Sequence, residues 1–156
     1  GSYTVSLSGA YSEVRVSALA AVNAVGDVID PKSGKILAGA RRSPDSSEFA
    51  HTVEVLKRGH RAPMRTGNTT LVAVATNARL NKVQAAKLAQ MAQHGLVRAI
   101  SPVHLMSDGD IVIALSAGEA RADVDALGVA AAQAVSEAIV RAVREAKTMG
   151  GIPGLK

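Results

Sequence analysis

Two neighbouring threonines, Thr69 and Thr70, follow the pair Gly67-Asn68 where a basic loop gives way to an apolar stretch. At the start of a strand, threonine ordinarily reflects only the strand preference of β-branched residues. A threonine hydroxyl becomes a nucleophile when a base takes its proton, and the residue's own α-amine can act as that base. This amine is free only after the preceding peptide bond is cut. Because Gly67 permits backbone strain, the Asn68–Thr69 bond is a candidate self-cleavage site.

Asp108 and Asp110 precede a second apolar stretch, and Asn23 lies inside a third. The simplest interpretation makes Asp-Gly-Asp a turn and makes Asn23 a cap or a bridge to a neighbouring loop. In an extended segment, however, residues two apart share a face, so the two carboxylates could hold a threonine hydroxyl and its ammonium. An asparagine amide can donate to a developing oxyanion. The candidate catalytic residues are therefore Thr69, Asn23, Asp108 and Asp110.

The histidines indicate no strong metal site. Residues 51, 60, 94 and 104 are histidines on different expected elements, without ligand spacing. A weaker alternative is that His104, Asp108 and Asp110 together bind a metal ion. The chain has no cysteine, which excludes disulfides, zinc–thiolate sites and thiol catalysis and fits a reducing compartment. We expect neither a metal nor a cofactor, and we expect a cytoplasmic location.

Composition predicts one domain with an aliphatic core. The chain has 156 residues, of which 47% are hydrophobic and 2% aromatic. Alanine-rich helices against valine-rich strands indicate an α/β or α+β arrangement of layers.

The net charge is +5, but aromatic platforms for nucleic-acid bases are nearly absent, so we expect no nucleic-acid partner. No uncharged apolar run reaches about 18 residues, so we expect no membrane span. No signal peptide is visible, and the initial Gly-Ser is either a cloning remnant or part of a longer chain.

Hydrophobic patterning predicts the order of the elements. Residues 13–29 are expected as one strand, followed by a turn at 30–35 and a partner strand at 36–40. A polar loop at 41–47 leads to a short helix within 47–59, which Gly59 ends. Residues 60–68 form an exposed basic loop, and 69–76 is the strongest strand pattern.

The second half alternates helices and strands. A helix over 81–94 begins with a capping-box pattern at Asn81 and Gln84 and ends at Gly95. Residues 96–104 are expected to be extended, 108–118 to be a turn running into a buried strand, and 122–147 to be a long helix.

Two stretches, VSALAAVNAVGDVIDPKSGKILAG and GNTTLVAVATNARLNKVQAAKLAQMAQHGLVRAISPVHLMSDGDIVIALSAG, resemble the L-aminopeptidase/D-esterase (DmpA-like) family. This family includes β-peptidyl aminopeptidases and nylon-oligomer hydrolases. The resemblance implies a four-layer α/β/β/α sandwich of the N-terminal-nucleophile type, assembled as a homotetramer of cleaved protomers. It also implies a cut before Thr69, which divides the single domain 1–156 into an α-chain part, 1–68, and a β chain, 69–156.

The resemblance assigns roles by position. Thr69 corresponds to the nucleophile, Asn23 to an asparagine near the reacting carbonyl, and Asp108 and Asp110 to paired aspartates beside the nucleophile. Family precursors are longer, and this chain corresponds to their C-terminal half. The N-terminal portion is therefore an expected partner, because it carries a lysine of Thr-type members and, in Ser-type members, acidic residues that recognise a substrate amine.

Three functional interpretations remain open. The first is a self-processing amidohydrolase or aminopeptidase acting on short peptides, with the 6-aminohexanoate oligomers of nylon as an alternative substrate. The second is a non-catalytic binding or assembly domain, in which residues 67–70 are only a turn and the basic loop at 57–65 binds a polyanion. The third is another N-terminal-nucleophile fold, such as a proteasome subunit or an asparaginase-like amidase, although their motifs are not found.

Overall fold

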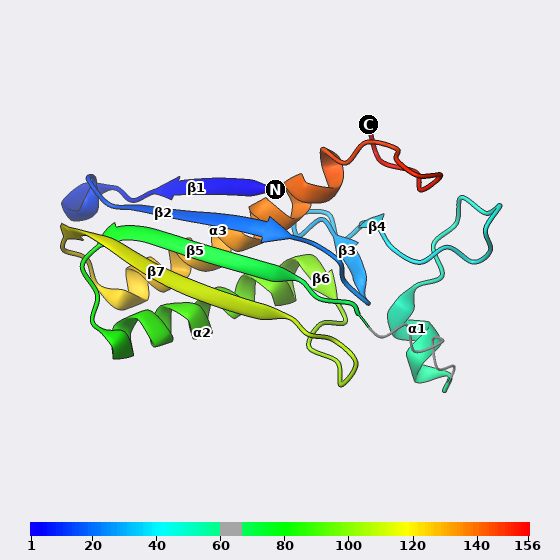
Figure 1. The fold of residues 1–156 in the computed structure, drawn as a ribbon, viewed down its shortest axis with the longest axis horizontal. Helices are drawn as coiled ribbons and strands as arrows, with labels where there is room; N and C mark the ends of the chain where they lie inside the picture. Colours follow the sequence, from blue (N-terminus) through cyan, green and yellow to red (C-terminus); the bar gives the residue numbers. More distant parts are fainter. Residues whose placement is uncertain (60–66) are drawn as a thin grey trace.

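Two long helices cover one face of a four-stranded sheet, and a three-stranded sheet lies beside one end of it (Figure 1). The computed structural model describes residues 1–59 and 67–156. The elements are β1 (Ser2–Ser6), the 3-10 helix η1 (Gly9–Tyr11), β2 (Arg15–Ala21), β3 (Asp27–Ile29), β4 (Ile36–Ala38), α1 (Thr52–Lys57), β5 (Leu71–Ala78), α2 (Lys82–Ala99), β6 (Ile100–Ser101), β7 (Ile111–Ala120) and α3 (Val124–Arg144).

The larger sheet has the order β1-β2-β5-β7. Its first two pairs are antiparallel, and β5 and β7 are parallel. Helix α2 lies between these two parallel strands in the sequence, as a crossover requires. Because Leu71 of β5 pairs with Ile111 of β7, the residues just before the two strands also become neighbours. This register brings the threonine pair next to the Asp-Gly-Asp segment.

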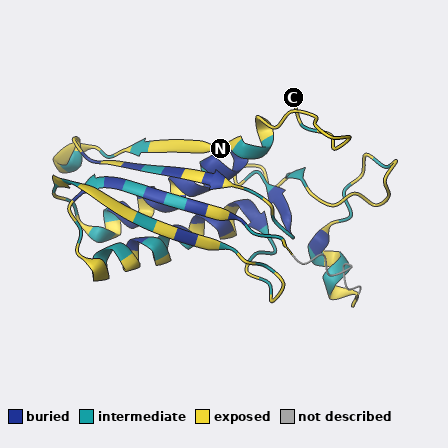
Figure 2. Ribbon diagram, viewed as in Figure 1, coloured by how far each residue is buried: buried dark blue, intermediate teal, exposed yellow. Residues whose placement is uncertain are grey.

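The core is built from small aliphatic side chains. Strands β2 and β5 alternate between buried and less buried residues (Figure 2), and the buried set includes Val16, Val72 and Val74. Helix α3 packs on β1 and β2, and α2 packs on α3 and β7. Gly95 of α2 lies against α3, since an added Cβ would meet the Ala132 carbonyl oxygen at 2.5 Å. Absence of a side chain there lets the two helices approach closely.

The opposite face of the large sheet is apolar and uncovered in the described chain. Five side chains on it are between 45% and 61% exposed: Leu19, Leu71, Ile111, Ile113 and Leu115. Strand pairing places Leu19, Ala73 and Ile113 in one row across three strands. The described residues thus supply one helical layer and one sheet layer of a four-layer α/β/β/α arrangement, and this face is the side that a second sheet covers in such a sandwich.

The small sheet, of order β4-β3-β6, is tied to α1 by a buried carboxylate. Asp27 at the start of β3 accepts hydrogen bonds from the backbone N–H of Thr52 and from its hydroxyl, both at 2.8 Å. Gly39 passes close to this carboxylate, since an added Cβ would meet an Asp27 oxygen at 2.2 Å. These contacts fix the first turn of α1 onto β3.

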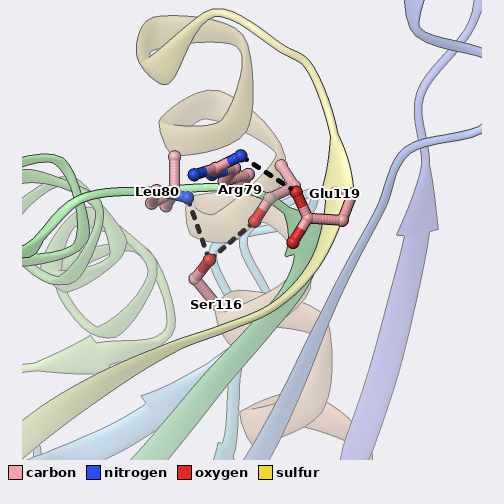
Figure 3. Close-up of polar contacts among 5 residues, drawn as sticks. Arg79, Leu80, Ser116 and Glu119 are labelled. Atoms are coloured by element: carbon pink, nitrogen blue, oxygen red, sulfur yellow. Dashed lines mark hydrogen bonds and ion pairs between the residues drawn. The ribbon is translucent and has the colours of Figure 1, made fainter.

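At the other end of the large sheet, the pairing of β5 with β7 shifts register. Ser116 forms hydrogen bonds to the chain that follows β5 at this point (Figure 3). Ser116 donates to the Ala78 carbonyl at 2.7 Å and accepts from the Leu80 N–H at 3.0 Å. Arg79 and Glu119 form an exposed ion pair beside it at 3.2 Å. The serine thereby stabilises the turn from β5 toward α2, and the Asn81–Gln84 capping box that starts α2 is present as predicted.

Helix α3 is the one helix in the described part of the chain whose length and composition would allow it to cross a membrane. The core helix of a soluble protein meets the same criteria. Eleven of its residues are buried in this structure, and it packs on β1, β2 and α2.

Several predicted boundaries are wrong for local reasons. The expected strand 13–29 is two strands in different sheets, because the segment 22–26 turns between them. Gly26 lies in that turn, and an added Cβ would meet the Pro102 carbonyl oxygen at 2.0 Å. The strand expected at 69–76 begins at Leu71, since Thr69 and Thr70 make other contacts described below. Strand β7 was expected to be buried, but one of its faces is exposed.

The predicted helices also differ in extent. Gly95 does not end α2, which continues to Ala99, because this glycine serves helix packing. Only Ile100–Ser101 of the expected extended segment 96–104 forms a strand. The short helix covers only Thr52–Lys57, with Gly59 at φ +76° after it as predicted. Most of the predicted basic loop 60–68, namely 60–66, lies outside the described residues.

Candidate active site

The candidate site forms where β5 and β7 begin, at one end of the large sheet. The parallel pairing continues upstream of both strands: the Ile111 N–H donates to the Thr70 carbonyl at 3.1 Å, and Asn68 bridges to Asp108. The Thr70 N–H donates to the Asp110 carboxylate at 2.7 Å. The structure therefore brings together Thr69 and both predicted aspartates, although about forty residues of chain separate them.

The peptide bond between Asn68 and Thr69 lies at the centre of these contacts. The Thr69 hydroxyl donates to the Asn68 carbonyl oxygen at 2.7 Å. The Gly109 N–H donates to the same oxygen at 3.1 Å. On the other side of the bond, the Thr69 N–H donates to the backbone carbonyl of Asn23 at 2.9 Å. The hydroxyl, the carbonyl beside it and the nitrogen between them are thus all held by neighbouring groups.

Asn23 lies in the segment between β2 and β3 and contacts the same stretch in two ways. Its side-chain amide donates to the Gly67 carbonyl at 2.9 Å, and its backbone carbonyl accepts from Thr69. The Asn68 side chain donates to the Ala24 carbonyl at 3.2 Å. Asn23 is therefore beside the candidate scissile bond as expected. Its side-chain amide, however, donates to the Gly67 carbonyl and not to the Asn68 carbonyl, which is the one expected to react. Gly67 has a φ of +123°, which favours glycine.

Asp110 anchors the site. Its side chain is fully buried, and its two oxygens accept from the Thr70 N–H at 2.7 Å and the His104 N–H at 3.3 Å. The His104 ring nitrogen Nδ1 lies 3.8 Å from the same carboxylate. His104 adopts a left-handed backbone with φ +57°. This conformation places both its N–H and its ring near Asp110.

Asp108 has a different environment. Both of its carboxylate oxygens are buried and have no hydrogen-bond partner among the residues that the structure describes. Burial raises the pKa of Asp108 above its ordinary value, and the negative charge of Asp110 raises the pKa further. The two predicted aspartates therefore differ in kind: Asp110 is a hydrogen-bonded anchor, whereas Asp108 is a buried carboxyl group whose pKa is raised above its ordinary value.

The alternative metal site is not formed within the described residues 1–59 and 67–156. No group of three histidine, aspartate or glutamate side chains there could hold a metal ion. The His104 ring nitrogen Nδ1 lies 3.8 Å from the Asp110 carboxylate, and His60 lies outside the described residues.

Two contacts of the site, those of Gly109 and His104, are not predicted from the sequence. Gly109 stands between the two predicted aspartates, yet its contribution is a backbone N–H, which residue types alone do not reveal. The sequence predicts His104 only as a metal ligand, whereas the structure places its backbone N–H and its ring beside the Asp110 carboxylate. A left-handed conformation at a histidine has no clear sequence signal.

Residues 1–156 match the family described as peptidase family S58. The chain belongs to this family. Among curated relatives, an uncharacterized aminopeptidase of Mycobacterium leprae is 34% identical, over 88% of this chain and 42% of its own length. A 6-aminohexanoate-oligomer endohydrolase of Kocuria sp. is 27% identical, over 85% of this chain and 41% of its own length. The chain spans less than half the length of either relative.

Solved structures share the fold. The L-aminopeptidase D-Ala-esterase/amidase of Ochrobactrum anthropi, described as a variant of the N-terminal-nucleophile hydrolase fold, aligns with a TM-score of 0.62 at 24% identity, over 98% of this chain and 42% of its own. A Burkholderia sp. beta-aminopeptidase aligns with a TM-score of 0.57 at 25% identity, over 100% of this chain and 45% of its own. The resemblance to the L-aminopeptidase/D-esterase (DmpA-like) family and the α/β fold class of the N-terminal-nucleophile type are confirmed.

Proposed function

We propose that this chain is part of a self-processing amide-bond hydrolase whose nucleophile is Thr69, freed by cleavage of the Asn68–Thr69 bond. One observation carries the proposal: the Thr69 hydroxyl is 2.7 Å from the carbonyl oxygen of the residue before it. Membership of the S58 peptidases supports the hydrolase class, and the contacts of Asn23, Gly109 and Asp110 around this bond support its position.

Self-cleavage proceeds as an N-to-O acyl shift followed by hydrolysis. Oγ1 of Thr69 adds to the Asn68 carbonyl carbon and gives a tetrahedral intermediate. The carbon–nitrogen bond then breaks, and the hydroxyl proton ends on the departing nitrogen, which leaves an ester and a free α-amine. Water hydrolyses the ester, so that Asn68 keeps a carboxylate and Thr69 recovers its hydroxyl. The cut divides the chain into the segments 1–68 and 69–156.

The freed α-amine is the base for turnover. It takes the hydroxyl proton of Thr69 as Oγ1 attacks a substrate amide, and it returns that proton to the leaving amine. Water then resolves the acyl ester. Asp110 holds the start of β5 in place through the Thr70 N–H. Asp108 has carboxylate oxygens without partners in the described chain, and we assign it to the α-ammonium that forms during turnover.

The proposed substrates are short peptides with a free amine, the class indicated by the aminopeptidase names of the Mycobacterium and Burkholderia relatives. Linear 6-aminohexanoate oligomers are the second candidate. A 6-aminohexanoate-oligomer endohydrolase of Paenarthrobacter ureafaciens is 31% identical over 69% of this chain and 31% of its own length. Parallel assays of the complete protein with both substrate classes decide between them.

The proposal is tested by intact mass spectrometry and N-terminal sequencing of the complete protein, beside its Thr69→Ala and Thr70→Ala variants. We expect a wild-type fragment that begins at Thr69 and a matching fragment that ends at Asn68. Thr69→Ala should remain whole and inactive, whereas Thr70→Ala, the matched control, should still be cut. A Thr69→Ala variant that is cut or that turns over substrate would remove the nucleophile assignment.

A further inference from the structure

We infer that the backbone N–H of Gly109 is the oxyanion donor for self-cleavage, and that this position must be glycine to leave room for the nucleophile. The inference rests on the proposed cut between Asn68 and Thr69. It adds a catalytic residue to that reaction, because the N–H of Gly109 touches the carbonyl oxygen on which negative charge develops.

The contacts around the Asn68 carbonyl select this donor. Its oxygen accepts from the Thr69 hydroxyl at 2.7 Å and from the Gly109 N–H at 3.1 Å. During attack, the hydroxyl oxygen moves to the carbonyl carbon and gives up its proton, so its own hydrogen bond to the oxygen is lost. The Asn23 amide is engaged by the Gly67 carbonyl. Within the described residues, the Gly109 N–H is therefore the backbone donor left to the oxyanion.

The donor is held before the reaction begins. Asp108 and Asp110, on either side of Gly109, are fixed by the bridge to Asn68 and by the hydrogen bonds of the buried Asp110 carboxylate. The Asp108 N–H also donates to the Leu105 carbonyl at 2.9 Å. A donor that is already oriented stabilises a developing charge without reorganisation, which is the main requirement of an oxyanion site.

Gly109 must be glycine because a side chain would not fit there, and not because of its backbone conformation. Gly109 is absent from the glycines with positive φ, so an L-residue could adopt its backbone angles. A Cβ at this position, however, would lie 2.5 Å from the Thr69 hydroxyl oxygen and 3.6 Å from the Asn68 carbonyl oxygen. A side chain would therefore displace the nucleophile from the carbonyl while it leaves the N–H in place.

The donor is tested by replacing the amide at Gly109 with an ester, using cell-free translation of the complete protein with a suppressor tRNA that carries glycolic acid. This change removes the N–H and adds no atoms. Removal of one oxyanion donor typically costs about 10²–10³ in rate, so we expect self-cleavage to slow by about 100-fold or more. The matched control is the same replacement at Gly34, whose N–H donates to the Asp30 carbonyl at 2.8 Å in an exposed turn, and we expect that variant to be cut at the wild-type rate.

Hydroxylamine separates the two chemical steps, because it cleaves an accumulated ester but does not promote the acyl shift. We expect it to produce no fragment that begins at Thr69 in the Gly109 ester variant, whereas any attack on the introduced backbone ester cuts the chain between residues 108 and 109 and gives fragments of different mass. Gly109→Ala, made by ordinary mutagenesis, tests the space requirement independently and should also stay uncut, with circular dichroism and a melting temperature like those of Thr69→Ala.

Cutting of the Gly109 ester variant within threefold of the Gly34 control, a rate ratio that corresponds to well under 1 kcal/mol, would overturn the inference. A hydroxylamine-dependent cut before Thr69 in the ester variant, or cutting of Gly109→Ala at the wild-type rate, would overturn it as well. If Thr69→Ala remains whole in the same experiments, the proposed function survives these results. A wild-type protein that is never cut overturns both.

Discussion

Replacing Thr70 with valine should stabilise the uncut protein and leave self-cleavage intact. Thr70 is completely buried, and its hydroxyl oxygen has no hydrogen-bond partner among the described residues. Burial of a hydroxyl without a partner costs about 1–3 kcal/mol in protein mutational data. Valine has a similar shape and strand preference, and the Thr70 N–H that binds Asp110 is retained.

We therefore expect Thr70→Val to raise the free energy of unfolding by about 1–3 kcal/mol. For a domain of this size, the melting temperature should rise by about 2–4 °C for each kcal/mol. Urea unfolding of the complete protein in a Thr69→Ala background measures this, because that background keeps the chain whole. In the wild-type background, the rate of appearance of the fragment 69–156 measures self-cleavage.

Thr69→Val is the matched partner of this substitution, since it removes the neighbouring hydroxyl by the same chemical change. It should abolish self-cleavage. The reasoning would be refuted if Thr70→Val lowered the stability by about 1 kcal/mol or more, the size of a typical net hydrogen bond. That result would mean that the Thr70 hydroxyl has a partner. Loss of cutting in Thr70→Val would mean that the hydroxyl takes part in the reaction.

Three further outcomes are expected, each measured by urea unfolding in the Thr69→Ala background. Because the pKa of Asp108 is raised in the folded state, the free energy of unfolding falls as the pH rises from the ordinary pKa of 3.8 through the folded pKa. Asp108→Asn should therefore be more stable than its parent at pH 7 and no more stable below pH 3.8. A gain in stability that persists at low pH would contradict this linkage. Gly95→Ala should lower the free energy of unfolding by about 1–3 kcal/mol, and by more than Gly128→Ala does. The new Cβ at position 95 meets a backbone carbonyl at 2.5 Å, whereas the one at position 128 meets the flexible end of Met91 at 2.2 Å. Equal losses of stability would show that the helices can shift. Ser116→Ala should lower the free energy of unfolding by about 1–2 kcal/mol, because two hydrogen bonds are lost. In the protein that keeps Thr69, the same substitution should leave the rate of self-cleavage unchanged, because Ser116 lies at the other end of the sheet.

Hydrophobic patterning predicts the helices and the central strand well because each has a long, regular signal. The capping box at Asn81 marks the start of α2 as predicted, and the valines of β5 alternate as a half-buried strand requires. Predicted boundaries are wrong where a residue serves contacts between elements that are distant in the sequence. Gly95 is the clearest example, because its role depends on a helix about forty residues further along the chain.

The candidate site, like the element boundaries, is only partly predicted from the sequence. Residue types bring Thr69, Asn23 and the two aspartates into consideration, and the parallel pairing of β5 with β7 explains why these aspartates lie beside the threonines. The sequence does not distinguish the roles of Asp108 and Asp110, because burial and hydrogen bonding make that difference. A backbone donor such as Gly109 has no side-chain signal at all.

The position of the proposed cut changes how the protein can refold. Strand β5 lies in the middle of the large sheet, between β2 on one side and β7 on the other. A cut before Thr69 leaves β2 and β5 on different polypeptides, and β3 and β6 are separated in the same way. Hydrogen-bonded ladders within one chain then become the interface between two chains. Folding before the cut is unimolecular, whereas recovery after denaturation of the mature form would depend on concentration, so the lifetime of the mature form would be governed by its rate of unfolding.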